Sequence, residues 1–362
     1  MDTVASGPHA ERRPAFAEMY RALVSGERRG VRAAIWRAGL GLLSVPYGLA
    51  VGLRNWLYDR GWLRVERAAV PVVSVGNLTL GGTGKTPTVE YVARFYRTLD
   101  RRVAILSRGY GGDAVRNDEA LVLEENLPDV PHLQGADRAA LARIAVEELE
   151  SEVLVLDDGF QHRRLRRDLD LVLVDATAPW GYGRLFPRGL LREPLRGLRR
   201  AGVVLLTRCD QVPAEALARL RAEVGRRAPG VPVVESVHAP VRLVAGDGRD
   251  ADLALLAGRP LAAFCGIGNP PAFRRTLAGL GGEVRAFRTF PDHHRYTRSD
   301  VDDLRTWAQQ LPADAVIVTT QKDLVKLRLS QLGGRPVWAV QIALQPTAGQ
   351  DALDHQLRGV LA

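Results

Sequence analysis

The sequence predicts an α/β protein in which a three-layer α/β/α domain is followed by a second, smaller α/β domain and preceded by an N-terminal apolar helix. Three observations lead to this prediction. Apolar, β-branched runs alternate with helix-patterned stretches from residue 70 onward, which is typical of a parallel sheet covered on both faces. The first of these runs leads into a glycine-rich loop. An uncharged run, residues 38–53, comes before it.

The expected elements form two sets, which suits a chain of 362 residues. In the first set, strands are predicted at 70–76, 102–107, 152–158, 169–176 and 202–210, with helices at 85–99 and 135–150. In the second set, strands are predicted at 260–268, 283–290, 314–320 and 336–343, with helices at 270–280 and 298–311. A stretch rich in Gly and Asp, residues 244–260, predicts the junction between them.

The apolar run at 38–53 predicts a helix at a membrane surface. It is short for a membrane span, which needs roughly 20 apolar residues, and Pro46 interrupts it. Arginines and aromatic residues flank it, and such flanks favour a helix that lies in the membrane interface. A buried core helix with snorkelling arginines is the alternative. Residues 1–30 lack the apolar core of a secretory signal.

The composition describes a basic, core-forming chain, with 46% hydrophobic residues and a formal net charge of +9. This balance favours an anionic partner such as a lipid or a phosphorylated substrate, although the high arginine usage of a GC-rich genome explains it equally well. No aromatic–basic motif for nucleic acid is present, so no nucleic-acid partner is expected. The two cysteines, Cys209 and Cys265, form no C-x-x-C pair, which argues against a disulfide framework or a zinc site.

The glycine-rich loop SVGNLTLGGTGKTPTVE, residues 74–90, has the features of a phosphate-binding loop. Such a loop needs glycines that wrap the phosphates, a helix N-terminus that offers N–H groups, and a lysine. The first glycine of the usual pattern is replaced by Thr79, but the strand–loop–helix context is present. We therefore expect a P-loop-type domain that binds ATP, with Mg²⁺ on the Thr86 hydroxyl. The expected nucleotide contacts are Gly81, Gly82, Thr83, Gly84, Lys85 and Thr86.

A second signal is the apolar strand that ends in Asp157 and Asp158. A carboxylate at the end of a buried strand can hold Mg²⁺ or its waters beside a phosphate loop, and two adjacent acids would repel each other without a cation. A strand-to-turn boundary capped by Asp is the alternative. Asp158 is the expected Mg²⁺ ligand with Asp157 beside it, and the sequence leaves open which one binds the metal directly.

Six motifs then occur in a distinctive order: GNLTLGGTGKTP, SRGYGG, LDDGFQH, LLREP, FPDHHRY and TTQKD. Together they resemble the tetraacyldisaccharide 4'-kinase (lipid A 4'-kinase) family over roughly residues 30–345. The resemblance implies ATP-dependent phosphorylation of the 4'-hydroxyl of a tetraacylated glucosamine disaccharide 1-phosphate. It also implies two α/β/α domains that face a cleft, and a peripheral location on the cytoplasmic face of the bacterial inner membrane.

The resemblance also implies catalytic roles. The family's Asp-Glu-Pro segment corresponds to RNDEALV, which makes Asp118 the candidate base, although Ala120 replaces the Pro and the preceding loop is short. A histidine of the Asp-His-His segment pairs with this base, either His293 or His294, and we favour His293. In LLREP, Arg192 is expected to contact the transferred phosphate and Glu193 to assist Mg²⁺. Two questions remain open. Lys322 and Asp323 of TTQKD either bind nucleotide or form a structural pair. His162 either faces the cleft or is a structural histidine.

The sequence thus predicts a lipid kinase in three parts: an N-terminal segment with the interface helix at 1–64, a P-loop kinase domain at 65–245, and a second α/β domain at 246–362 that closes over the cleft. The expected partners are the lipid disaccharide and the inner-membrane surface, and a monomer is favoured. The alternative function is a P-loop nucleotide-switch ATPase or GTPase of the metallochaperone kind, which would need no acceptor base and no lipid-facing helix.

Overall fold

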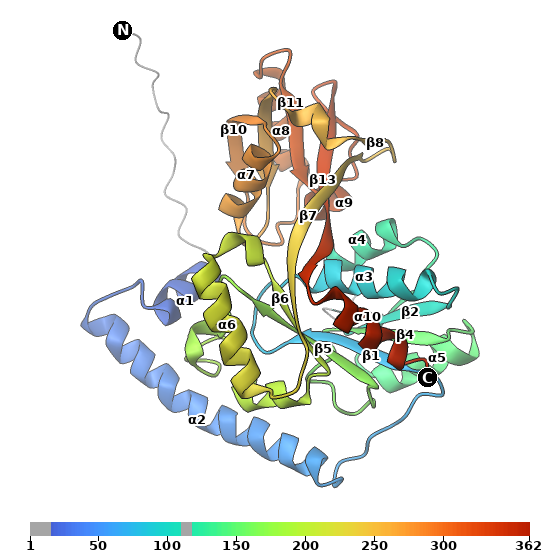
Figure 1. Ribbon diagram of the computed structural model, residues 1–362. Helices are drawn as coiled ribbons and strands as arrows, with labels where there is room; N and C mark the ends of the chain where they lie inside the picture. The colour runs from blue at the N-terminus through green and yellow to red at the C-terminus, as the bar shows by residue number, and fades with distance from the viewer. Residues whose placement is uncertain (1–15, 110–117) are drawn as a thin grey trace.

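The computed structural model of the chain describes residues 16–109 and 118–362. Figure 1 shows a larger α/β unit, a smaller α/β unit above it, and one long helix running along the underside of the larger unit. The helices of the described chain are α1 (Phe16–Ser25), α2 (Val31–Asp59), α3 (Lys85–Arg97), α4 (Asp118–Asn126), α5 (Arg138–Glu147), α6 (Ala214–Arg227), α7 (Pro270–Gly279), α8 (Arg298–Gln309), α9 (Gln321–Leu327) and α10 (Gln350–Gly359). The predicted α/β class with a P-loop-type domain is confirmed.

The larger unit is built on a parallel sheet with the strand order β3-β2-β4-β1-β5-β6-β7. Its strands are β1 (Val72–Asn77), β2 (Val103–Ser107), β3 (His132–Gln134), β4 (Val153–Asp157), β5 (Leu169–Asp175), β6 (Val203–Thr207) and β7 (Val233–Ala245). β1, β2, β4 and β6 are buried along their whole length, which explains their unbroken apolar sequence. Ligands of open α/β sheets bind outside the carboxyl ends of the strands, so the edge where β1 and β4 end is the place to look for a site.

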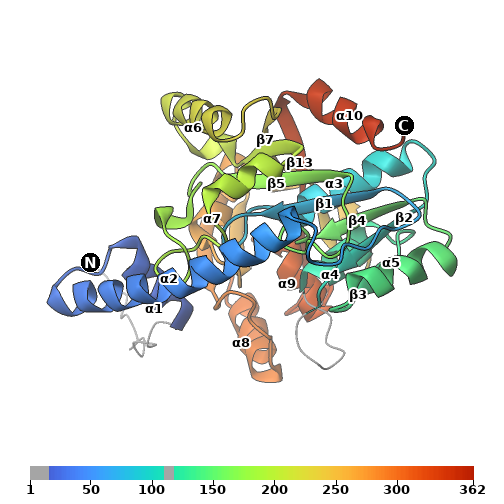
Figure 2. The same ribbon diagram turned by 90° about the horizontal axis from the view of Figure 1, so that it is seen from below.

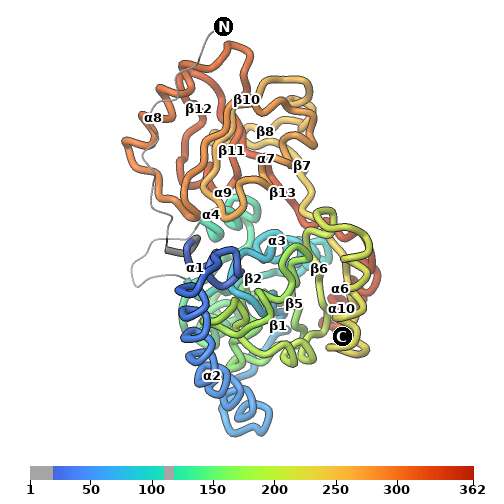
Figure 3. Tube along the Cα trace, turned by 90° about the vertical axis from the view of Figure 1, so that its left-hand side faces the viewer, coloured from blue at the N-terminus to red at the C-terminus, as the bar shows by residue number. Residues whose placement is uncertain are grey.

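The smaller unit has a parallel sheet with the order β10-β9-β11-β13. Its strands are β8 (Asp250–Ala251), β9 (Pro260–Cys265), β10 (Glu283–Thr289), β11 (Val316–Thr320), β12 (Gln331–Leu332) and β13 (Arg335–Ala348). Figure 3 shows the two units one above the other. β7 and β13 pair antiparallel from Glu235–Ala348 to Ala245–Trp338, and this long ribbon joins the two sheets into one.

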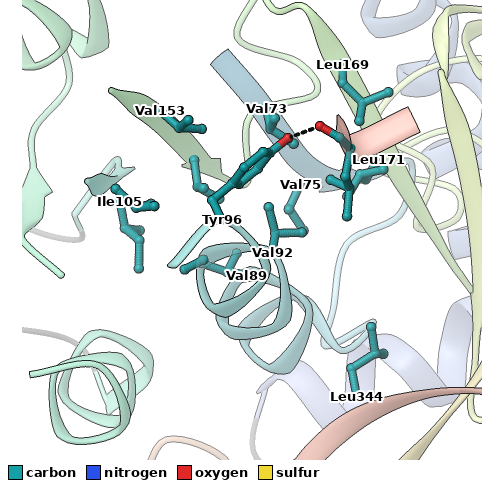
Figure 4. Close-up of a cluster of buried hydrophobic side chains, with 14 of the residues drawn as sticks. Val73, Val75, Val89, Val92, Tyr96, Ile105, Val153, Leu169, Leu171 and Leu344 are labelled. Atoms are coloured by element: carbon teal, nitrogen blue, oxygen red, sulfur yellow. Dashed lines mark hydrogen bonds between the residues drawn. The ribbon is translucent and has the colours of Figure 1, made fainter. Parts of the chain in front are cut away.

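The C-terminal helix α10 belongs to the core of the larger unit. Leu353 and Leu357 are buried in the same cluster as Val73 and Tyr96. The Tyr96 ring lies among the valines and leucines of the sheet (Figure 4), and its hydroxyl donates to the carbonyl oxygen of Leu357 at 2.8 Å. This return of the chain differs from the predicted division, which assigned all of residues 246–362 to the second domain.

The long helix α2 differs from the expected short apolar helix. It runs without a break from Val31 to Asp59, with Pro46 inside it, and is long and apolar enough to cross a membrane by length and composition. Figure 2 shows that it lies across the underside of the larger unit instead of extending away from it. Its large exposed apolar side chains are Val31, Ile35, Trp36, Leu42, Leu43, Val45, Leu49, Leu53 and Trp56.

Candidate active site

The glycine-rich loop lies where the sequence placed it, between the carboxyl end of β1 and the first residue of α3. Gly84 is the residue before the helix and has a left-handed backbone with φ of 91°, which suits glycine. Two side chains at the end of β6 hold the loop from behind: Thr207 Oγ1 donates to the carbonyl of Thr83 at 2.9 Å, and Arg208 Nη2 donates to that of Gly82 at 2.9 Å. With its carbonyls bound in this way, the loop keeps its N–H groups for an anion at the helix N-terminus.

His238 on β7 also contacts the loop, and no sequence motif pointed to it. A Cβ atom at Gly84 would lie 2.3 Å from His238 Nε2, so only glycine fits there. Burial, together with the charges of Arg208 and Lys322, lowers the pKa of His238 to about 3. The imidazole is therefore neutral at physiological pH. Within the described chain its buried Nε2 has no hydrogen-bond partner.

Asp157 and Asp158 lie at the end of β4 beside this loop, in different surroundings. Burial and the negative charge of Glu119 raise the pKa of Asp157 to about 6, and its buried Oδ1 has no hydrogen-bond partner among the described residues. Burial also acts on Asp158, but Lys85 and Arg192 outweigh it and lower the pKa of Asp158. Lys85 Nζ lies 3.8 Å from Asp158 Oδ1, and Arg192 Nη1 contacts both Asp158 oxygens at 2.8 and 2.7 Å.

These two carboxylates fit a divalent cation. Mg²⁺ is commonly held by one or two protein carboxylates together with substrate phosphates and water, so a pair of acids beside a phosphate loop is enough. The unpartnered Oδ1 of Asp157 is a free acceptor at this position. Within residues 16–109 and 118–362 there is no group of three or more His, Cys, Asp or Glu side chains suited to a metal. Thr86, the first-turn hydroxyl of α3, is buried.

Glu193 is committed to protein partners. Its side chain is fully buried, and both oxygens accept from Arg200 Nη2, at 3.0 and 2.9 Å. Gln161 Nε2 donates to Oε1 at 3.0 Å, and Asn55 Nδ2 of α2 donates to Oε2 at 3.1 Å. Because four hydrogen bonds fill its oxygens, Glu193 is better suited to fix the 192–193 segment than to bind the metal expected from sequence.

Asp118 and His293 come together across the two units. Asp118, the first residue of α4, is buried, and both its oxygens lie 3.0 Å from His293 Nδ1 of the smaller unit. Burial opposes ionisation of Asp118, but His293, Lys322 and Lys326 outweigh it and bring its pKa to about 2. The same hydrogen bond raises the pKa of His293. The His293 side chain is 58% exposed, so a ligand can reach this pair.

The adjacent His294 has a different role in the structure. Its Nε2 lies 3.0 Å from Asp300 Oδ2, at the start of α8, and its ring stacks on Phe290 at 4.9 Å. His293 is therefore the histidine that contacts Asp118.

His162, which follows the LDDGFQ segment, is a separate case. Burial and three nearby arginines lower the pKa of His162 to about 4.

The TTQKD motif divides between two tasks. Lys322 Nζ reaches Glu119, the neighbour of Asp118, at 2.8 Å. Asp323 is fully buried and accepts from the backbone N–H of Gly266 and from the hydroxyls of Thr320 and Tyr296. Lys322 therefore belongs to the cleft, whereas Asp323 stabilises the smaller unit. The motif SRGYGG lies partly outside the described residues.

The geometry thus brings a phosphate loop, two strand-end carboxylates and an Asp–His pair into one cluster of charged groups where the two units meet. Glu119 links them, since its charge raises the pKa of Asp157 while Lys85 and Lys322 lower its own against the effect of burial. Phosphoryl transfer consists mainly of positioning and charge neutralisation. A site that offers cations, two strand-end carboxylates and a carboxylate in contact with histidine is suited to transfer a phosphoryl group to a hydroxyl.

Comparison with known proteins gives one consistent family. Residues 36–362 match the model of "Tetraacyldisaccharide-1-P 4'-kinase". The tetraacyldisaccharide 4'-kinase of Anaeromyxobacter dehalogenans (strain 2CP-C) is 45% identical over 91% of this chain and 92% of its own, and that of Syntrophus aciditrophicus (strain SB) is 43% identical over 80% and 83%. The structure of LpxK from Aquifex aeolicus in complex with ATP matches with a TM-score of 0.73 and 32% identity, covering 90% of this chain and 100% of that one.

Proposed function

Because the chain belongs to the tetraacyldisaccharide 4'-kinase family, it is an ATP-dependent lipid kinase of lipid A biosynthesis, and we propose that the cleft described above carries out the transfer. The acceptor is the 4'-hydroxyl of a tetraacylated disaccharide 1-phosphate. Family membership decides against the nucleotide-switch alternative. The observation that carries the assignment of residues is the Asp118–His293 pair, whose neighbour Glu119 interacts electrostatically with Lys85 of the phosphate loop.

The phosphate loop and its neighbours hold the nucleotide. Gly81, Gly82, Thr83 and Gly84 let the backbone approach the phosphates, and Lys85 neutralises the β- and γ-phosphates. Mg²⁺ would be held by Thr86 and by Asp157 or Asp158, and it would withdraw charge from the phosphate oxygens. Asp157 is the carboxylate with a free oxygen. Asp158 is already bound by Arg192 and Lys85, so we place Asp157 closer to the metal and reverse the order expected from sequence.

Asp118 is the proposed acceptor of the proton. The oxygen of the 4'-hydroxyl attacks the γ-phosphorus, its proton passes to the Asp118 carboxylate, and the bond between the γ-phosphorus and the bridging oxygen breaks to release ADP. A carboxylate with a pKa of about 2 is fully ionised at neutral pH but is a weak base. Little proton transfer is needed before the loose transition state of phosphoryl transfer is reached, so a weak, well-oriented base suffices. His293 orients it through Nδ1, and Arg192 contacts the transferred phosphate.

The N-terminal helix is the proposed contact with the membrane. The exposed apolar side chains of α2 form one face, while its other face is bonded to the larger unit. A helix that contacts the larger unit from Ser44 to Asp59 and is apolar on its outer side suits the interface of a bilayer and not a span across it. Since ATP is produced in the cytoplasm, we place the protein on the cytoplasmic face of the inner membrane.

A single assay tests the proposal. Purified protein is incubated with γ-labelled ATP, Mg²⁺ and the tetraacyldisaccharide 1-phosphate in detergent, and the lipid is extracted and separated. We expect label in a bisphosphorylated lipid, no label when the disaccharide lacks its free 4'-hydroxyl, and no label with Lys85→Ala. Label transfer to water alone, without a lipid product, would contradict the proposed kinase reaction.

A further inference from the structure

The helix α2 contacts the larger unit through a seam of small and polar residues on the side opposite its apolar face. Leu42, Leu49 and Leu53 on the apolar side are 74%, 69% and 57% exposed. On the other side, a Cβ atom at Gly48 would lie 2.9 Å from a Leu185 methyl, so the helix backbone lies close to the 185–193 segment. Ser44 Oγ donates to the carbonyl of Leu185 at 3.1 Å.

Two hydrogen bonds of this seam end on consecutive residues of the proposed phosphate site. The hydroxyl of Tyr47 donates to the backbone carbonyl of Arg192 at 2.7 Å. Asn55 Nδ2 donates to Glu193 Oε2 at 3.1 Å. Tyr47 and Asn55 are eight residues apart on α2, which places them on the same face of the helix. A helix that served only as an anchor would need neither contact.

Arg192 connects these two hydrogen bonds of α2 to Asp158, the carboxylate that follows β4. Arg192 Nη1 contacts both oxygens of Asp158 and also lies 3.3 Å from Gln161 Oε1. Gln161 Nε2 in turn donates to Glu193 and to the carbonyl of Asn77 at the end of β1. The helix, the metal-binding edge and the start of the phosphate loop are thus joined by one hydrogen-bonded network.

We propose that Tyr47 and Asn55 are positioning residues for phosphoryl transfer: the polar face of α2 holds Arg192 and Glu193 in place, and through them the Asp158 and Gln161 side chains. The helix then has two separable faces, an outer one for the lipid surface and an inner one for the reaction. This inference rests on the proposed roles of Arg192 and Asp158.

The physical reason is the loss of one of the two donors to Glu193 Oε2, which accepts from Asn55 and from Arg200. Glu193 is fully buried, so water cannot replace the Asn55 donor. The carboxylate keeps Arg200 and Gln161, and it is expected to shift toward them. Such a shift of Glu193 also moves the adjacent Arg192. In the Asn55 variant the backbone carbonyl of Arg192 keeps its hydrogen bond from Tyr47, and in the Tyr47 variant it loses that bond. Small misplacements of groups that contact the phosphate lower the rate of transfer more than they lower binding.

The test compares the two faces of α2 in the full chain, using the lipid disaccharide dispersed in detergent so that membrane partitioning does not limit the rate. Tyr47→Phe removes one oxygen and Asn55→Ala one amide. Each should lower kcat by about 10-fold, the scale of one hydrogen bond expressed in the transition state. KM for the lipid and co-sedimentation with vesicles of phosphatidylethanolamine and phosphatidylglycerol should stay unchanged. The matched control Leu49→Ser on the outer face should reduce co-sedimentation and leave kcat unchanged.

A double mutant shows whether Tyr47 acts through Arg192. In an Arg192→Ala background, Tyr47→Phe should lower kcat by less than about 2-fold, because residues that act as a unit are not additive. Defects that multiply in the double mutant overturn the proposal, as does a Tyr47→Phe variant of unchanged thermal stability with wild-type kcat. These outcomes are distinct from failure of the proposed function, in which the wild-type chain itself would make no bisphosphorylated lipid.

Discussion

The pair formed by Asp118 and His293 leads to the sharpest prediction. Replacing Asp118 by Ala should lower kcat by ~10²–10⁴-fold, the usual scale for the loss of a general base. This corresponds to about 2.7–5.5 kcal/mol of transition-state stabilisation, since each factor of ten is worth about 1.36 kcal/mol. Among the described residues, His293 contacts both Asp118 oxygens at 3.0 Å and lies nearer to them than Lys326, at 3.7 Å. His293→Ala should therefore produce a defect of similar size, because it releases the carboxylate from its orientation.

The assay is a cycle of four proteins with saturating ATP and lipid. If the two residues act as a unit, the double mutant Asp118→Ala/His293→Ala is little worse than either single one. ATP affinity should change by less than a few-fold, because Asp118 does not belong to the phosphate loop. His294→Ala is the control: that ring contacts Asp300 and Phe290, so it should alter stability more than kcat.

Three results would refute the reasoning in different ways. Multiplying defects in the double mutant would mean that Asp118 and His293 act independently. A damaging His294→Ala together with a mild His293→Ala would assign the orienting role to the other histidine. An Asp118→Ala protein with nearly wild-type kcat would exclude Asp118 as the base and make Asp157 the next residue to replace.

Further predictions concern charge, pH and the core. Lys85→Ala should abolish transfer in a protein with an unchanged unfolding midpoint, and near-normal lipid phosphorylation would disprove the role of the loop. Asp118 raises the pKa of His293 above its usual 6.5. Their interaction should therefore stabilise the fold fully below pH 6.5 and weaken as the pH rises through the raised pKa. Unfolding midpoints measured across this range should decline in the wild type, and His293→Ala should remove the decline. Leu357→Ala should cost ~2–5 kcal/mol of unfolding free energy in urea, against less than ~0.5 kcal/mol for the exposed His355→Ala.

β1, β2, β4 and β6 were predictable because each is buried along its whole length and leaves a nearly unbroken apolar run in the sequence. β7 was not predicted. Its sequence VVESVHAPVRLVA carries Pro240, and its buried end segments flank a partly exposed middle, since the strand leaves the larger sheet and becomes half of the ribbon with β13. α10 was missed for another reason: it is polar on one side, and only its packing against Tyr96 and Val73 places it in the first core.

The site was predictable where its residues are close in sequence to a structural signal. The glycines and Lys85 lie between a strand and a helix, and the two aspartates end a strand. The choice between His293 and His294 depends on which way a turn directs each ring, and two partners of Glu193, Asn55 and Gln161, are 138 and 32 residues away in the chain. Such long-range pairings follow from the assembled fold, and a single sequence carries no signal for them.

The placement of the two halves of the proposed catalytic pair would couple the chemistry to the arrangement of the units. Asp118 and Glu119 begin α4 on the larger unit, whereas His293 and Lys322 belong to the smaller one. Both cross-unit contacts therefore form only when the units stand as they do here.

A buried amide network holds that arrangement. Asn126, the last residue of α4, donates to Glu90 of α3 at 2.8 Å and accepts from Gln321 of α9 at 2.6 Å and Gln341 of β13 at 2.8 Å. The helix that begins with the proposed base thus ends on side chains from the phosphate-loop helix and from the smaller unit. Lys85 and His293 are consequently connected through α4, and we propose that this connection sets the separation between the phosphate loop and the proposed base.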